Sequence, residues 1–206
     1  MKDAQGGHVT GRVRWRKFAA LAVPGLAVTG ALAVALANGA LAASFAVSGQ
    51  QFKVSADSLE GDGFVQYGSV DTNVRGELLP VAVTGVKKAE ISNLCQSVLT
   101  TLPVIGDISL KLSAGTGGKK VEATDLLLDA TYLAGDASFN NIEIGRDAST
   151  LDKGPAKARG MQDMFAQQAD DVRMTGMKQT AWATTAGTFR LSGLSMKIHK
   201  GRTECF

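Results

Sequence analysis

The sequence has few of the residues on which hydrolases depend. It contains two histidines, and His8 precedes a long hydrophobic segment, so His199 alone is available to a site in the rest of the chain. No G-x-S-x-G nucleophile motif occurs, and residues 193–197, which come closest, lack the second glycine. They follow an alternating strand pattern, in which Ser195 is expected to face outward. We interpret His199 as a surface residue and not as a general base.

Signatures of metal and cofactor sites are also missing. Residues 115–120, GTGGKK, lack the spacing of a phosphate-binding loop and have no Ser or Thr after the lysines. The acidic stretch at 60–63 is too short for a calcium loop, and two cysteines without a nearby histidine pair cannot form a zinc site. The sequence therefore predicts no catalytic, metal-binding or cofactor-binding residues.

Acidic residues are plentiful, and most of them fall in predicted turns, where Asp is favoured by hydrogen bonding to the backbone. A pair of carboxylates for glycoside hydrolysis is defined by its separation in space, so the sequence leaves that possibility open. The residues concerned are Asp57, Glu60, Asp62, Asp147, Asp152, Asp170 and Asp171.

Charge is absent from residues 18–43, which run from Phe18 to Ala43 and are preceded by four basic residues between positions 12 and 17. Such a run is favourable in a bilayer, and its lack of any polar face argues against a buried helix of a soluble protein. The positive-inside rule places residues 1–17 in the cytosol and residues 44–206 outside. We therefore expect three parts: a basic flank, a hydrophobic helix and an exported domain.

Two interpretations of the hydrophobic segment stay open. Residues 18–37 alone are long enough to cross the ~30 Å bilayer core, which favours a transmembrane anchor. Ala40-Leu41-Ala42 fits a signal-peptidase site, and Pro24 and the many small residues favour a cleaved signal. The first interpretation predicts a cell-membrane protein with an extracytoplasmic domain, and the second predicts a secreted one.

The basic isoelectric point comes from the membrane flank. Residues 1–43 hold five basic residues and one acidic residue, whereas residues 44–206 hold 17 basic and 18 acidic residues. The exported part is thus nearly neutral, and its charge gives no reason to expect a nucleic-acid partner.

Both cysteines, Cys95 and Cys205, lie in the expected exported part. In an oxidising compartment they are expected to form a disulfide. Closing a loop of 110 positions would contribute about 4–5 kcal/mol in the chain-entropy model and would fix the C-terminus.

A short motif predicts strands in the exported part: apolar, any, apolar, Ser or Thr, Gly. Its period of two places the apolar side chains on one face, and the glycine allows a bulge, a bend or a turn. Its irregular spacing argues against a solenoid. We predict a mainly β domain, either an antiparallel sandwich or a curved sheet folded over on itself. The copies lie at 45–49, 81–85, 172–176 and 189–193, with a variant at 110–115.

Several shorter elements are also predicted. Strands are expected within residues 63–71, 126–133, 139–144 and 180–189. Apolar residues at helical spacing predict a short helix over 160–169 and a short helix-like element over 91–102. Turns are expected at 59–63, 115–120 and 145–147, with a loop at 153–160.

Three stretches resemble a family of uncharacterised actinobacterial exported proteins: RWRKFAALAVPGLAVTGALA (14–33), LCQSV (94–98) and QTAWATTAGTFRLSGLSMKI (179–198). Members of that family carry one N-terminal hydrophobic segment and are often labelled cholesterol esterase. They resemble the partners of small multi-span membrane proteins encoded beside them. The resemblance implies a role in a cell-envelope complex, and it carries no catalytic residues to this chain.

Two functions follow as expectations. The first is a non-enzymatic envelope protein that binds an apolar ligand or a membrane-protein partner, held at the membrane by residues 18–43. The second is a sterol or lipid ester hydrolase, which would need His199 beside a serine. Ser192 and Ser195 are nearest in sequence, but on an uninterrupted strand Ser195 would lie ~13 Å from His199 at ~3.3 Å per residue. A triad would therefore need a serine from elsewhere in the fold.

Overall fold

The structure is a computed structural model that describes residues 47–206. The expected cytosolic flank and hydrophobic helix lie outside these residues. Within residues 47–206, no helix has the length and apolar character needed to cross a membrane.

The described chain is mainly β, as predicted. Its elements in chain order are β1 (Phe52–Thr72), β2 (Leu78–Ser92), β3 (Leu94–Leu102), β4 (Gly106–Ala114), β5 (Val121–Asn140), β6 (Glu143–Asp147), a 3-10 turn η1 (Ala148–Thr150), β7 (Phe165–Thr185), β8 (Thr188–Arg190) and β9 (Ser195–Lys200).

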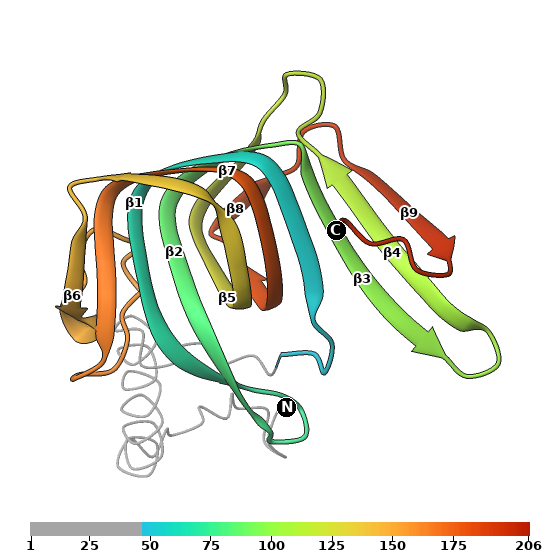
Figure 1. The fold of residues 1–206 in the computed structure, drawn as a ribbon, viewed down its shortest axis with the longest axis horizontal. Coiled ribbons are helices and arrows are strands. Elements are labelled where there is room, and N and C mark those ends of the chain that lie inside the picture. The colour runs from blue at the N-terminus through green and yellow to red at the C-terminus, as the bar shows by residue number, and fades with distance from the viewer. Residues whose placement is uncertain (1–46) are drawn as a thin grey trace, which may run out of the picture. The chain divides into compact units, whose positions relative to one another are not determined.

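The strands form one nine-stranded sheet with antiparallel ladders, and part of this sheet closes on itself. β1 pairs with β2 along one edge and with β7 along the other, while β5 pairs with both β2 and β7. These four strands therefore make a closed ring, seen on the left of Figure 1. Of the two predicted architectures, the structure has the sheet folded over on itself.

The long strands bend at residues with a left-handed backbone. Gly63, Asp125 and Gly176 have φ of 69°, 49° and 61°, and each falls at a gap in a ladder. Such a residue is left out of the regular pairing and bends the strand. After it, the side chains that would have faced outward face inward, and the reverse. Gly176 ends one copy of the strand motif, so the motif's glycine is here a bend within a strand, as predicted.

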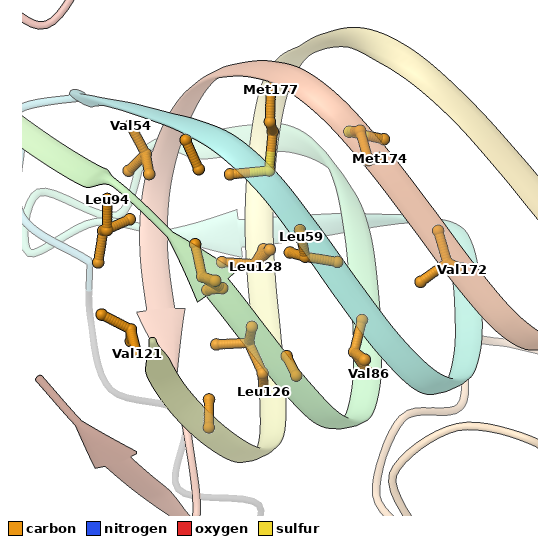
Figure 2. Packing of buried hydrophobic residues seen from close by; sticks show 14 of the residues in the cluster. Val54, Leu59, Val86, Leu94, Val121, Leu126, Leu128, Val172, Met174 and Met177 are labelled. Atoms are coloured by element: carbon orange, nitrogen blue, oxygen red, sulfur yellow. The ribbon is translucent and has the colours of Figure 1, made fainter. Parts of the chain in front are cut away.

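The main core fills the ring. Apolar side chains from β1, β2, β5 and β7 point inward and meet around Leu59, Val86, Leu126 and Val172 (Figure 2). The cavity left among them has a volume of about 20 Å³, which is the space of about one water molecule. The ring is therefore packed solid.

A second core covers part of the outer face of the ring, under the segment 148–164. Val65 and Tyr67 of β1 pack there against Leu151 and Ala158. The approach is so close that a Cβ on Gly154 would lie 2.5 Å from Val65. A glycine is thus required where the predicted loop at 153–160 crosses the sheet.

Three strands leave the ring as a separate arm, which we define as β3, β4 and β9 (Figure 1, right). β2 and β3 continue in one register against β1, since Ser58 pairs with Ser92 and Ser55 with Cys95. Between them Asn93 has φ of 50°, and its N–H donates to the Gly115 carbonyl at 3.0 Å. At this residue the outer neighbour of the strand changes from β5 to β4.

The C-terminal residues 201–206 fasten the arm on its outer face. A disulfide joins Cys95 of β3 to Cys205, with Cα atoms 5.9 Å apart, so the predicted pair is confirmed. The Cys205 N–H donates to Ser97 Oγ at 3.0 Å. Glu204 forms a salt bridge of 3.1 Å with Lys53 of β1. The tail therefore ties the arm back to the ring.

Several local predictions were wrong. Residues 160–169 contain a turn and the start of β7, and the apolar residues that suggested a helix, Met161 and Phe165, are exposed. Residues 91–102 are strand: Ile91 and Leu94 both reach the core because the bend at Asn93 changes the parity, which imitates helical spacing. Residues 59–63 lie within β1, and residues 145–147 lie within β6.

The remaining local predictions agree better with the structure. The stretches 63–71, 126–133 and 180–189 are largely strand, and residues 115–120 connect β4 to β5 without regular structure. The stretch 139–144 is divided between β5 and β6 by a short break.

We expect the disulfide to dominate the stability of the arm. Replacing Cys95 and Cys205 together with alanine should lower the free energy of unfolding by about 2–5 kcal/mol, because the C-terminal tail is then free in the unfolded chain. Chemical denaturation of the two proteins measures this. Intact mass after alkylation with and without reductant gives the direct check, and two freely alkylated thiols in native protein would contradict the pairing.

Candidate functional site

An apolar surface lies on one face of the arm. Cross-strand partners share a face of a sheet, and the ladders place Val98 beside Leu110 and Ile198, and Leu112 beside Met196. Ile198 is 73% exposed, Met196 59% and Leu110 38%. We call these five residues the arm face.

The arm face is the continuation of the core side of the sheet. Leu94 and Ala114 lie on the same side of β3 and β4, a few residues nearer the ring, and both are buried in the main core. Beyond them the sheet departs from the ring, and nothing in the described chain covers it. A contiguous group of exposed apolar residues such as this one is typical of a surface that binds another molecule.

An unsatisfied polar group lies at the base of this face. Gln179 of β7 stands in one row with Val54, Gln96, Leu112 and Met196 across five strands. It is 1% exposed, and within the described residues neither its Oε1 nor its Nε2 has a hydrogen-bond partner. An amide left in this way costs on the order of 1–3 kcal/mol. The side-chain amide of Gln179 therefore offers a hydrogen-bond donor and an acceptor at the point where the arm leaves the ring.

The outer edge of the arm is also unpaired in the described chain. β9 is the last strand of the sheet order, with β4 on one side. Lys197 and Lys200 lie on this edge strand, and neither forms a salt bridge within residues 47–206. Lysines on an edge strand oppose pairing with an identical strand, because like charges then face each other.

The opposite face of the arm carries the residues that an esterase would need. His199 pairs with Ser109 across β4 and β9, and Ser195 pairs with Ser113. Ser109 Oγ donates to the Gly201 carbonyl at 2.8 Å and accepts from the Thr203 N–H at 2.9 Å. Its only proton is therefore committed to the backbone.

Neither of the two serines nearest to His199 in sequence is hydrogen-bonded to it, although Ser195 and His199 line the same groove of about 280 Å³. Ser192 precedes β9 in a turn, where its carbonyl accepts from the Gly115 N–H at 2.7 Å. Ser195 lies on the same strand as His199, four residues away. Within residues 47–206, no hydrogen bond joins His199 to a serine or a carboxylate. The arm thus brings one serine opposite His199, and that serine serves the C-terminal tail.

Three grooves lie on the surface of the ring, two of them lined by charged residues and the third lined mainly by apolar groups. Two grooves of about 410 and 400 Å³ lie on either side of Glu60 and Asp62. Their walls carry ion pairs, such as Arg173 to Glu60 at 2.9 Å and Lys120 to Glu90 at 2.6 Å. A third groove, of about 360 Å³, lies between residues 155–157 and the ends of β5 and β7. All three grooves are open to solvent and do not enclose a ligand.

The acidic residues singled out in the sequence mostly hold the fold together. Asp170 forms a salt bridge of 2.8 Å with Lys153, and Asp147 accepts from the N–H groups of Ser149 and Asp163. The Ser149 hydroxyl, which also donates to Asp147, and then these N–H groups lower the pKa of Asp147, while the hydrogen bond from Lys153 lowers the pKa of Asp170. Of the remainder, Asp62 and Asp171 face each other across β1 and β7. Asp57, Glu60 and Asp152 each accept a hydrogen bond from a neighbouring side chain.

Sequence reasoning missed a different acidic pair. Burial and the nearby charge of Asp71 raise the pKa of Asp129 to about 6, and burial also raises the pKa of Asp71. Burial and Asp129 together raise the pKa of Tyr67 to about 12. Asp71 Oδ2 is buried without a partner among the described residues. The signal in the sequence was Asp129 itself, which interrupts the apolar run 126–133.

The fold defines a class of protein: a small all-β domain with a solid, ring-shaped core, an extended arm and one disulfide. The chain belongs to the family of unknown function DUF6230, which it matches over residues 48–206. The expectation of an uncharacterised family is thereby confirmed, while the esterase label is not part of this match. Neither the comparison with curated proteins nor that with solved structures gives a match.

The buried carboxyl of Asp129 predicts a pH-dependent stability. Its pKa in the folded state, about 6, lies above the ordinary value of 3.8, so the folded protein holds this proton more tightly than the unfolded chain. The associated stability is fully present below the ordinary pKa and is lost as the pH rises through about 6. Asp129→Asn should therefore be more stable than wild type above that pH, on the order of 1 kcal/mol after allowing for partial solvation.

The control for this prediction is Asp136→Asn, on an exposed position of the same strand. Thermal unfolding of the three proteins between pH 4 and 8 makes the measurement. If the difference in unfolding temperature between Asp129→Asn and wild type is the same at pH 4 and at pH 8, the carboxyl does not titrate as described.

Proposed function

We propose that this protein is a non-enzymatic, membrane-attached extracytoplasmic module that docks an extramembrane segment of a membrane protein on its arm face. The single observation that carries the proposal is the apolar face of β3, β4 and β9, which continues the core side of the sheet without any cover. The resemblance to envelope proteins found beside small multi-span membrane proteins supplies the class of partner.

A protein partner fits this face better than a small apolar ligand. Small ligands are held in concave sites of roughly 300–1,000 Å³ that enclose most of their surface. The interior cavity of the ring has about 20 Å³, and the arm face is an open sheet surface. A partner segment can instead bury Met196 and Ile198 together and pair with the free edge of β9.

Charge argues against a second copy as the partner. If β9 paired with β9 of another molecule in an antiparallel ladder, Lys197 and Lys200 of the two edges would lie close together. Like charges directly opposite each other destabilise a strand pair. A segment with apolar and acidic residues in alternation would satisfy both the arm face and the basic edge.

Membrane attachment is proposed from residues 18–43. Their length and the basic flank favour an anchor that keeps the described domain at the outer surface of the membrane. A cleaved signal would release the domain, so the two interpretations differ in where the mature chain is found.

The docking proposal predicts a contact through Ile198. A photoreactive benzoylphenylalanine at this position, in full-length protein in native membranes, should form an adduct with a multi-span membrane protein, identified by mass spectrometry. The matched control is the same substitution at Ile144, which is 66% exposed against 73% for Ile198 and lies on β6, the other edge strand. An adduct with a second copy of this chain, or equal adducts at both positions, would contradict the proposal.

The attachment proposal predicts the N-terminus of the mature protein. Full-length chain should remain in washed membranes and require detergent for release. A mature protein that begins at Ala43 or Ser44 in the culture medium would show that the segment is a cleaved signal. Intact mass of the purified protein from its native host distinguishes the two.

A further inference from the structure

We propose that two turns of this domain, β1–β2 and β3–β4, insert apolar side chains into the outer surface of the membrane. The turns end in exposed aliphatic residues: Val74 is 77% exposed, Leu78 72%, Ile105 57%, and Val104 is completely exposed. The inference rests on the membrane attachment proposed above and adds the orientation of the domain.

The two turns lie at one end of the described domain. Figure 1 shows both of them at the lower edge of the view, together with the point where the described chain begins. The loop between β4 and β5 and the turn between β8 and β9 lie at the upper edge. Strands of the ring and of the arm therefore carry their apolar turns toward the same side.

The start of the described chain ties the end of the domain that carries the two turns to the hydrophobic segment. Val47 forms a bridge with Asn73 of the β1–β2 turn, and its N–H donates to the Thr72 carbonyl at 3.1 Å. Four peptide steps separate Ala43 from Val47, which span about 14 Å at most. If residues 18–43 cross the bilayer, the β1–β2 turn is held within that distance of the end of the hydrophobic segment.

The backbone of the β3–β4 turn gives an independent indication. Val104 has φ of 73°, a conformation that a β-branched side chain adopts only against steric strain. Glycine or asparagine is the usual residue at such a position, and the side chain of Val104 packs against nothing that would compensate. A strained, fully exposed valine at a turn apex is explained if the side chain is buried in lipid.

Charged residues lie within the β1–β2 turn and just behind the β3–β4 turn, as an interfacial position requires. Arg202 pairs with Asp107 at 2.9 Å, Arg75 pairs with Glu77 at 3.0 Å, and Lys200 lies opposite Ile108 on the arm. Paired charges and one free lysine give little net attraction to anionic lipid. The apolar side chains would thus supply the contact, and the charged residues would stay at the level of the headgroups.

The test uses full-length protein in native membranes with benzoylphenylalanine placed at Val74 or Val104. The matched control is Leu194, which is 50% exposed and belongs to the turn between β8 and β9 at the other end. Lipid adducts, identified by mass, are expected at both test positions and in excess over Leu194 on the order of tenfold. Intact mass confirms that each variant keeps the disulfide.

The remaining outcomes separate the two proposals. If the chain stays in washed membranes but Val74 and Val104 give protein adducts or none, membrane insertion of the turns is wrong and the attachment stands. Equal lipid adducts at all three positions would also overturn the insertion, since they would show no preferred orientation. If the chain is found free of the membrane, the attachment fails, and the insertion of the turns fails with it.

Discussion

Closing four long strands into a ring requires every strand to bend, and this constraint governs the rest of the structure. The bends lie in rows across neighbouring strands: Gly63 of β1 and Asp125 of β5 stand on either side of Lys87 in the ladders. Each bend breaks the alternation of side chains while the ladder on both sides keeps its register. The core therefore stays continuous through the bends, and the residues on either side of a bend reach it at a spacing of three instead of two.

The bend at Asn93 has a second consequence, because the outer neighbour of the strand changes there. β5 remains with the ring and β4 leaves with the arm, so the inner face of the sheet is buried as far as Leu94 and Ala114 and uncovered beyond them. Gly115 makes this separation possible: with φ of 70°, it lies where a Cβ would be 3.0 Å from the Ile91 carbonyl oxygen. The uncovered arm face is thus a direct product of the same geometry that closes the ring. The tail and its disulfide then hold the arm from the other side, which leaves the apolar face free.

The strand content and the curved sheet could be predicted from the sequence because period-two alternation survives between bends. The helix-like spacing of 91–102 could not be interpreted correctly, since a break in alternation at Asn93 produces the same i, i+3 pattern as a helical turn. Helical spacing in residues 160–169 had a different origin: Met161, Met164 and Phe165, which suggested the helix, are exposed and mark no buried face. Cys95 and Cys205 were predictable because only one pairing exists, whereas the arm face was not, because Leu110, Met196 and Ile198 read as ordinary strand residues.

The raised pKa of Asp129 arose in the same way, from a contact that only the fold creates. Asp71 and Asp129 are on different strands with β2 between them, and nothing in their spacing indicates that they share a face.

The two proposals concern different parts of the domain and together impose one orientation on the arm. The strands of the arm run from the β3–β4 turn toward the junction at Asn93, so a turn held at the membrane surface directs the arm face sideways, along the membrane, and not into it. A partner docked on that face would then stand beside this domain with its own extramembrane segment parallel to β9. A soluble partner would gain nothing from such an arrangement, but a membrane protein would meet the face without leaving the bilayer. Anchoring two proteins in one surface would also raise their effective concentration, which lowers the affinity that the arm face must supply for association.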